Sequence, residues 1–93
     1  MINKENYLKI SKMVDTGCER ERINAEFDAA RAAMDSVDVA VSSNEQIPNC
    51  FRVAWDSAYE ELSTSVNCRP ETQLNALKEC LDVIEYFEWK HYM

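Results

Sequence analysis

The chain has 93 residues and a net charge of −7, from 17 acidic and 10 basic residues, with one glycine and two prolines. This length makes a single domain, residues 1–93, with one small core, and so few glycines and prolines exclude a small all-β domain, which needs many turns. The acidity argues against direct binding to nucleic acid or to an anionic membrane, because lysine and arginine hold phosphate groups.

A short helix is expected over about residues 4–14, with Asn3 as its cap. The chain breaks after this helix, and the break has two interpretations. Thr16 and Glu19 have the spacing of a capping box that starts the next helix, whereas Gly17 alternatively closes the first helix in a left-handed conformation. The apolar stripe of this first helix consists of Tyr7, Ile10 and Val14, with Leu8 and Met13 beside them.

The second predicted helix follows this break and frays by Ser42 or Ser43, because β-branched residues lower its helix propensity there. Its apolar residues alternate in steps of four and three, which is typical of a seam in a helical bundle. The stripe consists of Ile23, Phe27, Ala30, Met34, Val37 and Val41. The opposite face is almost all polar, with Glu21, Asn24, Asp28, Arg31, Asp35 and Asp38.

A polar connection over residues 42–48 leads to a third helix, which has Pro48 in its first turn and runs to about Thr64. After a turn at residues 67–69, Pro70 opens a fourth helix. Both helices repeat the spacing of four and three. The third stripe is Phe51, Trp55, Ala58 and Leu62, with Val66 just past it, and the fourth is Leu74, Leu77, Leu81 and Ile84, followed by Phe87 and His91.

These elements predict an all-α fold, a small antiparallel helical bundle with three long helices plus a short N-terminal helix. The connections are short, so neighbouring helices run in opposite directions, and the stripes need one another because isolated helices of this length are marginal in water. Stripes with this spacing also form coiled coils between chains, so a homodimer is an alternative.

Motifs for catalysis and for metal binding are absent from the sequence. The spacings between Cys18, Cys50, Cys68 and Cys80 do not match zinc ligands, and we expect free, mostly buried thiols. A single glycine excludes a glycine-rich phosphate loop, and the single histidine, His91, lies near the end of the chain where helices fray. The densest carboxylates, at residues 60–61 and 79–88, fall on helix faces that the pattern exposes. We expect no enzymatic activity, no cofactor and no metal.

Two acidic rows stand out as candidate partner-binding surfaces. Residues seven apart on a helix lie nearly in line, so the first row extends about 20 Å along the second helix. Carboxylates in such rows imitate a phosphate backbone toward basic proteins that handle nucleic acid. The first row comprises Glu21, Asp28 and Asp35, joined by Asp38, and the second comprises Asp82 and Glu85, with Glu79 and Glu88 nearby.

A second apolar face at the end of the fourth helix is the most informative feature of the sequence. This face consists of Tyr86, Trp89 and Met93, with Tyr92 beside them, and it points away from the predicted core. Exposed aromatic residues flanked by charge are typical anchors of an interface. In the alternative interpretation, Tyr7, Leu8 and Ile10 of the first helix cover this face. Lys4, Lys9 and Lys12 would then lie near Glu85 and Glu88.

The sequence favours a non-enzymatic, acidic interaction protein that binds and occludes a larger, basic protein. In size and charge the chain resembles the small acidic inhibitors that bacteriophages make against host defence systems, of the anti-CRISPR and anti-restriction classes. This resemblance covers overall character and assigns no residue. The alternative is a structural or regulatory subunit, antitoxin-like or adaptor-like, that acts through helix-mediated homo- or hetero-dimerisation. Without an apolar signal segment or a run of about 18 apolar residues, we expect a soluble, cytoplasmic protein.

Overall fold

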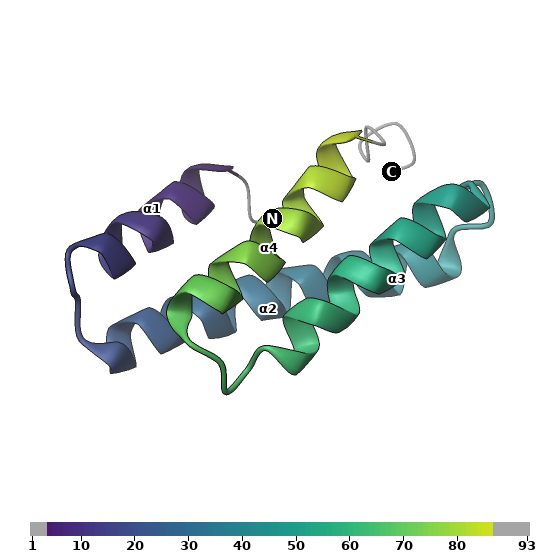
Figure 1. The fold of residues 1–93 in the computed structure, drawn as a ribbon. Helices are drawn as coiled ribbons and strands as arrows, with labels where there is room; N and C mark the ends of the chain where they lie inside the picture. The colour runs from purple at the N-terminus through teal and green to yellow at the C-terminus, as the bar shows by residue number, and fades with distance from the viewer. Residues whose placement is uncertain (1–3, 87–93) are drawn as a thin grey trace.

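The computed structural model describes residues 4–86, except for the side chain of Lys4. Figure 1 shows four helices, α1 (Lys4–Asp15), α2 (Arg20–Ser43), α3 (Asn49–Thr64) and α4 (Pro70–Tyr86), and the described residues contain no strand. The predicted all-α fold is therefore confirmed. The predicted cap Asn3, the apolar Phe87 and His91 lie outside the described residues.

The end of α1 is fixed by Gly17, as the second of the two interpretations predicts. Gly17 has a φ of 71°, and its N–H donates to the carbonyl of Val14, while the N–H of Cys18 donates to the carbonyl of Met13. This pair of hydrogen bonds is the Schellman motif, which needs a left-handed residue. The capping-box interpretation is wrong, because the Thr16 hydroxyl donates back to the carbonyl of Lys12.

The predicted stripe of α2 is confirmed, because all six of its residues are buried. The helix also ends where its propensity falls, at Ser43. The turn that follows is held from α3, because the Arg52 guanidinium donates to the carbonyls of Val41 and Asn44. Ile47 is buried within this turn, and Pro48 lies one residue before α3 rather than inside it.

The stripe of α3 is buried as predicted, and Val66, which was predicted just past the stripe, is exposed. Val66 lies beyond the end of α3 and is 50% exposed, because the chain turns at residues 65–69 before α4 begins. On α4, Leu74, Leu77 and Leu81 are buried and Ile84 is half-buried. Burial of a large aromatic such as Trp55 makes a substantial contribution, since truncating such a residue to alanine costs about 3–5 kcal/mol.

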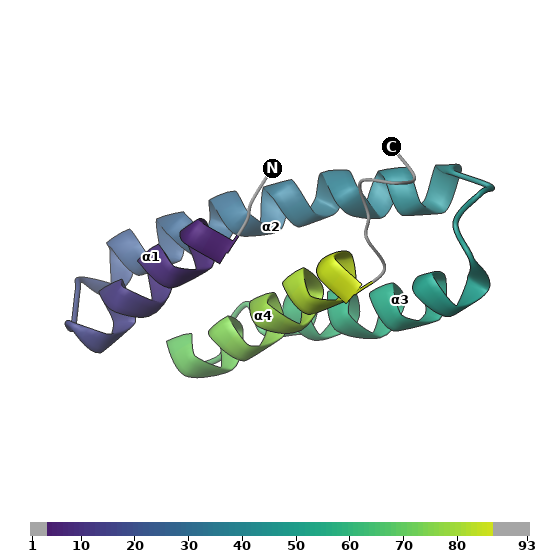
Figure 2. The same ribbon diagram turned by 90° about the horizontal axis from the view of Figure 1, so that it is seen from above.

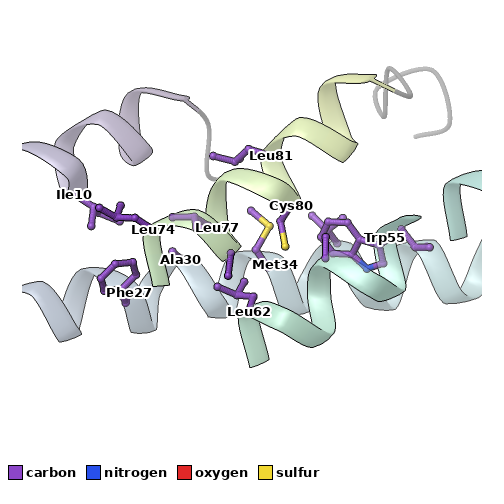
Figure 3. Packing of buried hydrophobic residues seen from close by; sticks show 14 of the residues in the cluster. Ile10, Phe27, Ala30, Met34, Trp55, Leu62, Leu74, Leu77, Cys80 and Leu81 are labelled. Carbon is purple, nitrogen blue, oxygen red and sulfur yellow. The ribbon is translucent and has the colours of Figure 1, made fainter. Parts of the chain in front are cut away.

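The helices pack so that α4 lies between α1 and α3. In Figure 2, α1 runs beside the first half of α2, and α3 runs beside its second half. Among the described helices, α1 does not contact α3, whereas α4 contacts α1, α2 and α3 and packs most extensively on α3. The core lies where these helices meet, and Figure 3 shows Ile10, Phe27, Met34, Trp55 and Leu77 converging there from all four of them.

No helix within residues 4–86 is at once long enough and apolar enough to cross a membrane.

Candidate interaction surfaces

The acidic row of α2 divides into two halves with different environments. Glu21 and Asp28 are exposed, and Asp28 makes only a loose ion pair with Arg31, 3.6 Å between oxygen and nitrogen. Asp35 and Asp38 instead accept hydrogen bonds from α3. The Tyr59 hydroxyl donates to Asp35, and the Trp55 indole N–H donates to Asp38 at 3.0 Å. Only the first half of the row presents carboxylates that lack a partner on α3.

The hydrogen bond between Tyr59 and Asp35 changes the pKa of the Tyr59 phenol. The hydrogen bond to Asp35, followed by partial burial and the negative charges of Asp35 and Asp38, raises the pKa of Tyr59 to about 12. The tyrosine therefore stays neutral at physiological pH and donates to Asp35. The Tyr59 ring also stacks on Trp55, with ring centroids 5.8 Å apart. Asp35 is thus a structural contact of α3 as well as an exposed carboxylate.

Arg31 does not belong to the solvent-facing side of α2, where the pattern placed it. Its side chain is only 15% exposed and lies over the Phe27 ring, with the guanidinium carbon 5.8 Å from the ring centroid. It donates to the side-chain oxygen of Gln73, a buried residue of α4 whose amide in turn donates to the carbonyl of Cys68. Arg31 therefore connects α2 to the start of α4.

The acidic residues of α4 that were predicted to bind a partner are on the surface. Asp82 and Glu85 are exposed, and Tyr86 is 78% exposed. Trp89, Tyr92, Met93 and Glu88 lie outside the described residues.

Helix α1 does not cover Tyr86. Ile10 is buried against the core side of α4, close to Leu74 in Figure 3, whereas Leu8 is 63% exposed. Lys9 pairs with Glu26 of α2 at 3.1 Å, so the expectation that it would lie by Glu85 is wrong. Lys9 therefore joins α1 to α2.

The four cysteines are free, as expected, but the expectation that most are buried is wrong. Only Cys80 is buried, while Cys18 and Cys68 are half-buried and Cys50 is exposed. Burial, with smaller effects from the charges of Glu79 and Glu61, raises the pKa of the Cys80 thiol to about 12, so this thiol is not a nucleophile at neutral pH. Within residues 4–86, no group of three or more histidine, cysteine or acidic side chains is arranged to hold a metal ion.

A pair of carboxyl groups that the sequence pattern assigned to separate exposed faces comes together in the structure. Glu61 of α3 and Glu79 of α4 both line a groove between these helices. Each directly precedes a buried residue, Leu62 and Cys80 respectively. The sequence therefore marks each residue as a neighbour of the packed seam, but it does not show which residues meet across the seam.

No protein-family model matches the chain, and neither a curated protein nor a solved structure matches it.

Proposed function

We propose that the chain is a non-enzymatic interaction protein that binds a larger, basic protein and occludes a surface on it. The observation that carries the proposal is the end of α4, where Tyr86 is 78% exposed beside the exposed Asp82 and Glu85. An aromatic side chain gives much contact area at a small cost in conformational entropy, and the acids around it favour a basic partner.

The exposed half of the acidic row on α2 supports the same class of partner. Glu21 and Asp28 face solvent on α2, and the whole chain carries a net charge of −7. Long-range attraction of this kind raises the rate of association with a basic surface and falls with ionic strength. A basic protein that handles nucleic acid fits this surface, and the chain itself binds neither nucleic acid nor a membrane in this proposal.

The scaffold in this proposal is a small antiparallel helical bundle in the cytoplasm. Its support is the order of contacts between α2 and α3, where Arg52 reaches Val41, Trp55 reaches Asp38 and Tyr59 reaches Asp35. In these three contacts the residue numbers rise along α3 while they fall along α2, which is the order expected of two antiparallel helices. Such a scaffold presents its surface without reorganising, which suits an inhibitor that acts by occlusion. An inhibitor of a host defence system, of the anti-CRISPR or anti-restriction class, is the specific form that size and charge favour.

The test is capture of the partner from the native host, identification by mass spectrometry, and measurement of its affinity for two variants. We expect Tyr86→Ala and Trp89→Ala each to raise Kd at least tenfold, because a residue of a binding hot spot costs about 2 kcal/mol or more when truncated. The matched control is Val53→Ala, an exposed apolar residue of α3. Association should also slow at high salt.

Unchanged binding by both variants, with an unchanged fold, would reject the aromatic residues as the binding site. Loss of folding in either variant would instead place that side chain in the core.

The second candidate is a structural or regulatory subunit that dimerises through a helix face. The observation in its favour is the set of large apolar side chains that are exposed in addition to Tyr86, namely Leu8, Val39, Val53 and Val66. Light scattering separates the two candidates, because a stable homodimer would support the subunit. A dimer that dissociates in Tyr86→Ala would assign the aromatic face to self-association.

A further inference from the structure

The groove between α3 and α4 has a volume of about 350 Å³ and lies where the chain turns from one helix to the other. Two of the residues that line it are acidic, Glu61 from α3 and Glu79 from α4. The remaining lining residues are neutral, namely Thr64, Ser65, Cys68, Thr72, Asn75 and Ala76. The helices on either side are the most extensively packed pair in the described part of the chain.

Glu61 and Glu79 line this groove from its two helices, so a proton on one carboxyl group can serve a hydrogen bond to the other. That bond, then burial, then the negative charges of Glu61 and Asp82, raise the pKa of Glu79 above its ordinary value. Two carboxylates have no donor between them, so the bond requires one proton. When both groups are ionised, their like charges repel instead.

No cation offsets this pair among the groove residues. Arg69 and Lys78 are neighbours in sequence of the lining residues Cys68 and Glu79, but neither lines the groove, and α1 and α2 contribute no lining residue. The third acid that acts on Glu79 is Asp82, on the same helix. The negative charges of both carboxylates also contribute to the raised pKa of the buried Cys80 thiol, after burial itself. A proton is therefore what relieves the repulsion.

We propose that Glu61 and Glu79 form a proton-dependent latch that joins α3 to α4 in mild acid and is released as both carboxyl groups ionise.

The sign of the effect follows from linkage. The folded chain holds the proton more tightly than the unfolded chain does, so the stabilisation from the latch is full below the ordinary pKa of glutamate. It is lost as the pH rises from that value through the raised pKa of Glu79. Above the raised pKa of Glu79 both carboxyl groups are ionised, and their repulsion loosens the α3–α4 turn.

The latch is tested by thermal unfolding of the full chain between pH 4 and pH 7 with Glu61→Gln and Glu79→Gln. A glutamine amide donates at every pH, so each variant imitates the protonated pair. We expect each variant to match the native chain at pH 4 and to exceed its Tm by about 2–4 °C at pH 7. The double variant should gain no more than either single one, because one change already removes the repulsion.

The matched control is Glu60→Gln, an exposed acid on α3 that does not line the groove. An equal gain from this control would overturn the latch, because it would show relief of the overall negative charge. A direct readout is the carboxyl titration of Glu79 by carbon NMR. We expect its raised pKa to return toward the ordinary value in Glu61→Gln, and an ordinary value in the native chain would also overturn the proposal.

Discussion

At the scale of single residues, the polar contacts between helices decide which charges are available to a partner. Asp38 is occupied by the indole of Trp55, and Arg31 by Gln73, so neither is free for another molecule. Both lie on the polar side of α2 in the sequence pattern. A polar residue next to a buried aromatic residue of a neighbouring helix is recognisable only when the pairing of the helices is known.

Asp38→Ala provides the test at this scale. We expect it to destabilise the chain by about 1–3 kcal/mol in urea unfolding, because the indole N–H of the buried Trp55 loses its acceptor. Asp28→Ala is the matched control, from the same acidic row but exposed, and should change the free energy of unfolding by at most about 0.5 kcal/mol. Equal costs for the two variants would show that the bond to Trp55 contributes nothing.

At the scale of the helix, the ends depend on a glycine conformation and on a contact from a neighbouring helix, not on side-chain caps at the helix starts. Neither Glu19 before α2 nor Pro48 before α3 makes a side-chain capping bond. The end of α1 instead depends on the left-handed Gly17, and the end of α2 is held by Arg52 from α3. The sequence contained both options for residues 16–19, and the conformation of glycine decided between them.

Gly17→Ala tests this account of the first turn. A Cβ at this position would meet nothing within 4 Å, so any cost comes from the backbone alone. We expect a loss of about 1–2 kcal/mol in the free energy of unfolding, since an L-residue resists a positive φ. Gly17→Asn should lose less, because asparagine tolerates this region. A neutral Gly17→Ala would mean that the turn readily adopts another conformation.

At the scale of the whole molecule, the helices and their buried faces were predictable and the details of their pairing were not. The stripes of α2 and α3 are buried as the spacing predicts, because helical periodicity is a local property. Gln73 is buried although it is polar, and Val66 is exposed although it is apolar. Both outcomes depend on how α4 is rotated about its axis and on where the preceding turn leaves α3. The spacing of apolar residues within each helix does not determine either of these.

The candidate site was predictable to a similar extent. The exposure of Asp82, Glu85 and Tyr86 agrees with the sequence pattern, which places none of them in the leucine stripe of α4. The contact between Asp35 and Tyr59 was missed, because it joins residues 24 positions apart on two helices. The meeting of Glu61 and Glu79 was missed for the same reason.

The position of α4 between α1 and α3 has a consequence for biosynthesis. Among the four described helices, the helix that joins the others comes after them in the chain, and α1 and α3 have no contact of their own. Before α4 is made, α2 can pack on α1 and on α3, but the parts of the three apolar faces that α4 covers stay exposed. We therefore expect the fragment 1–69 to unfold without a cooperative transition when circular dichroism is followed on heating. A sharp transition would contradict this. The four described helices accordingly complete their shared core only after α4 has been made, and until then the apolar residues that α4 covers are open to chaperones and to aggregation.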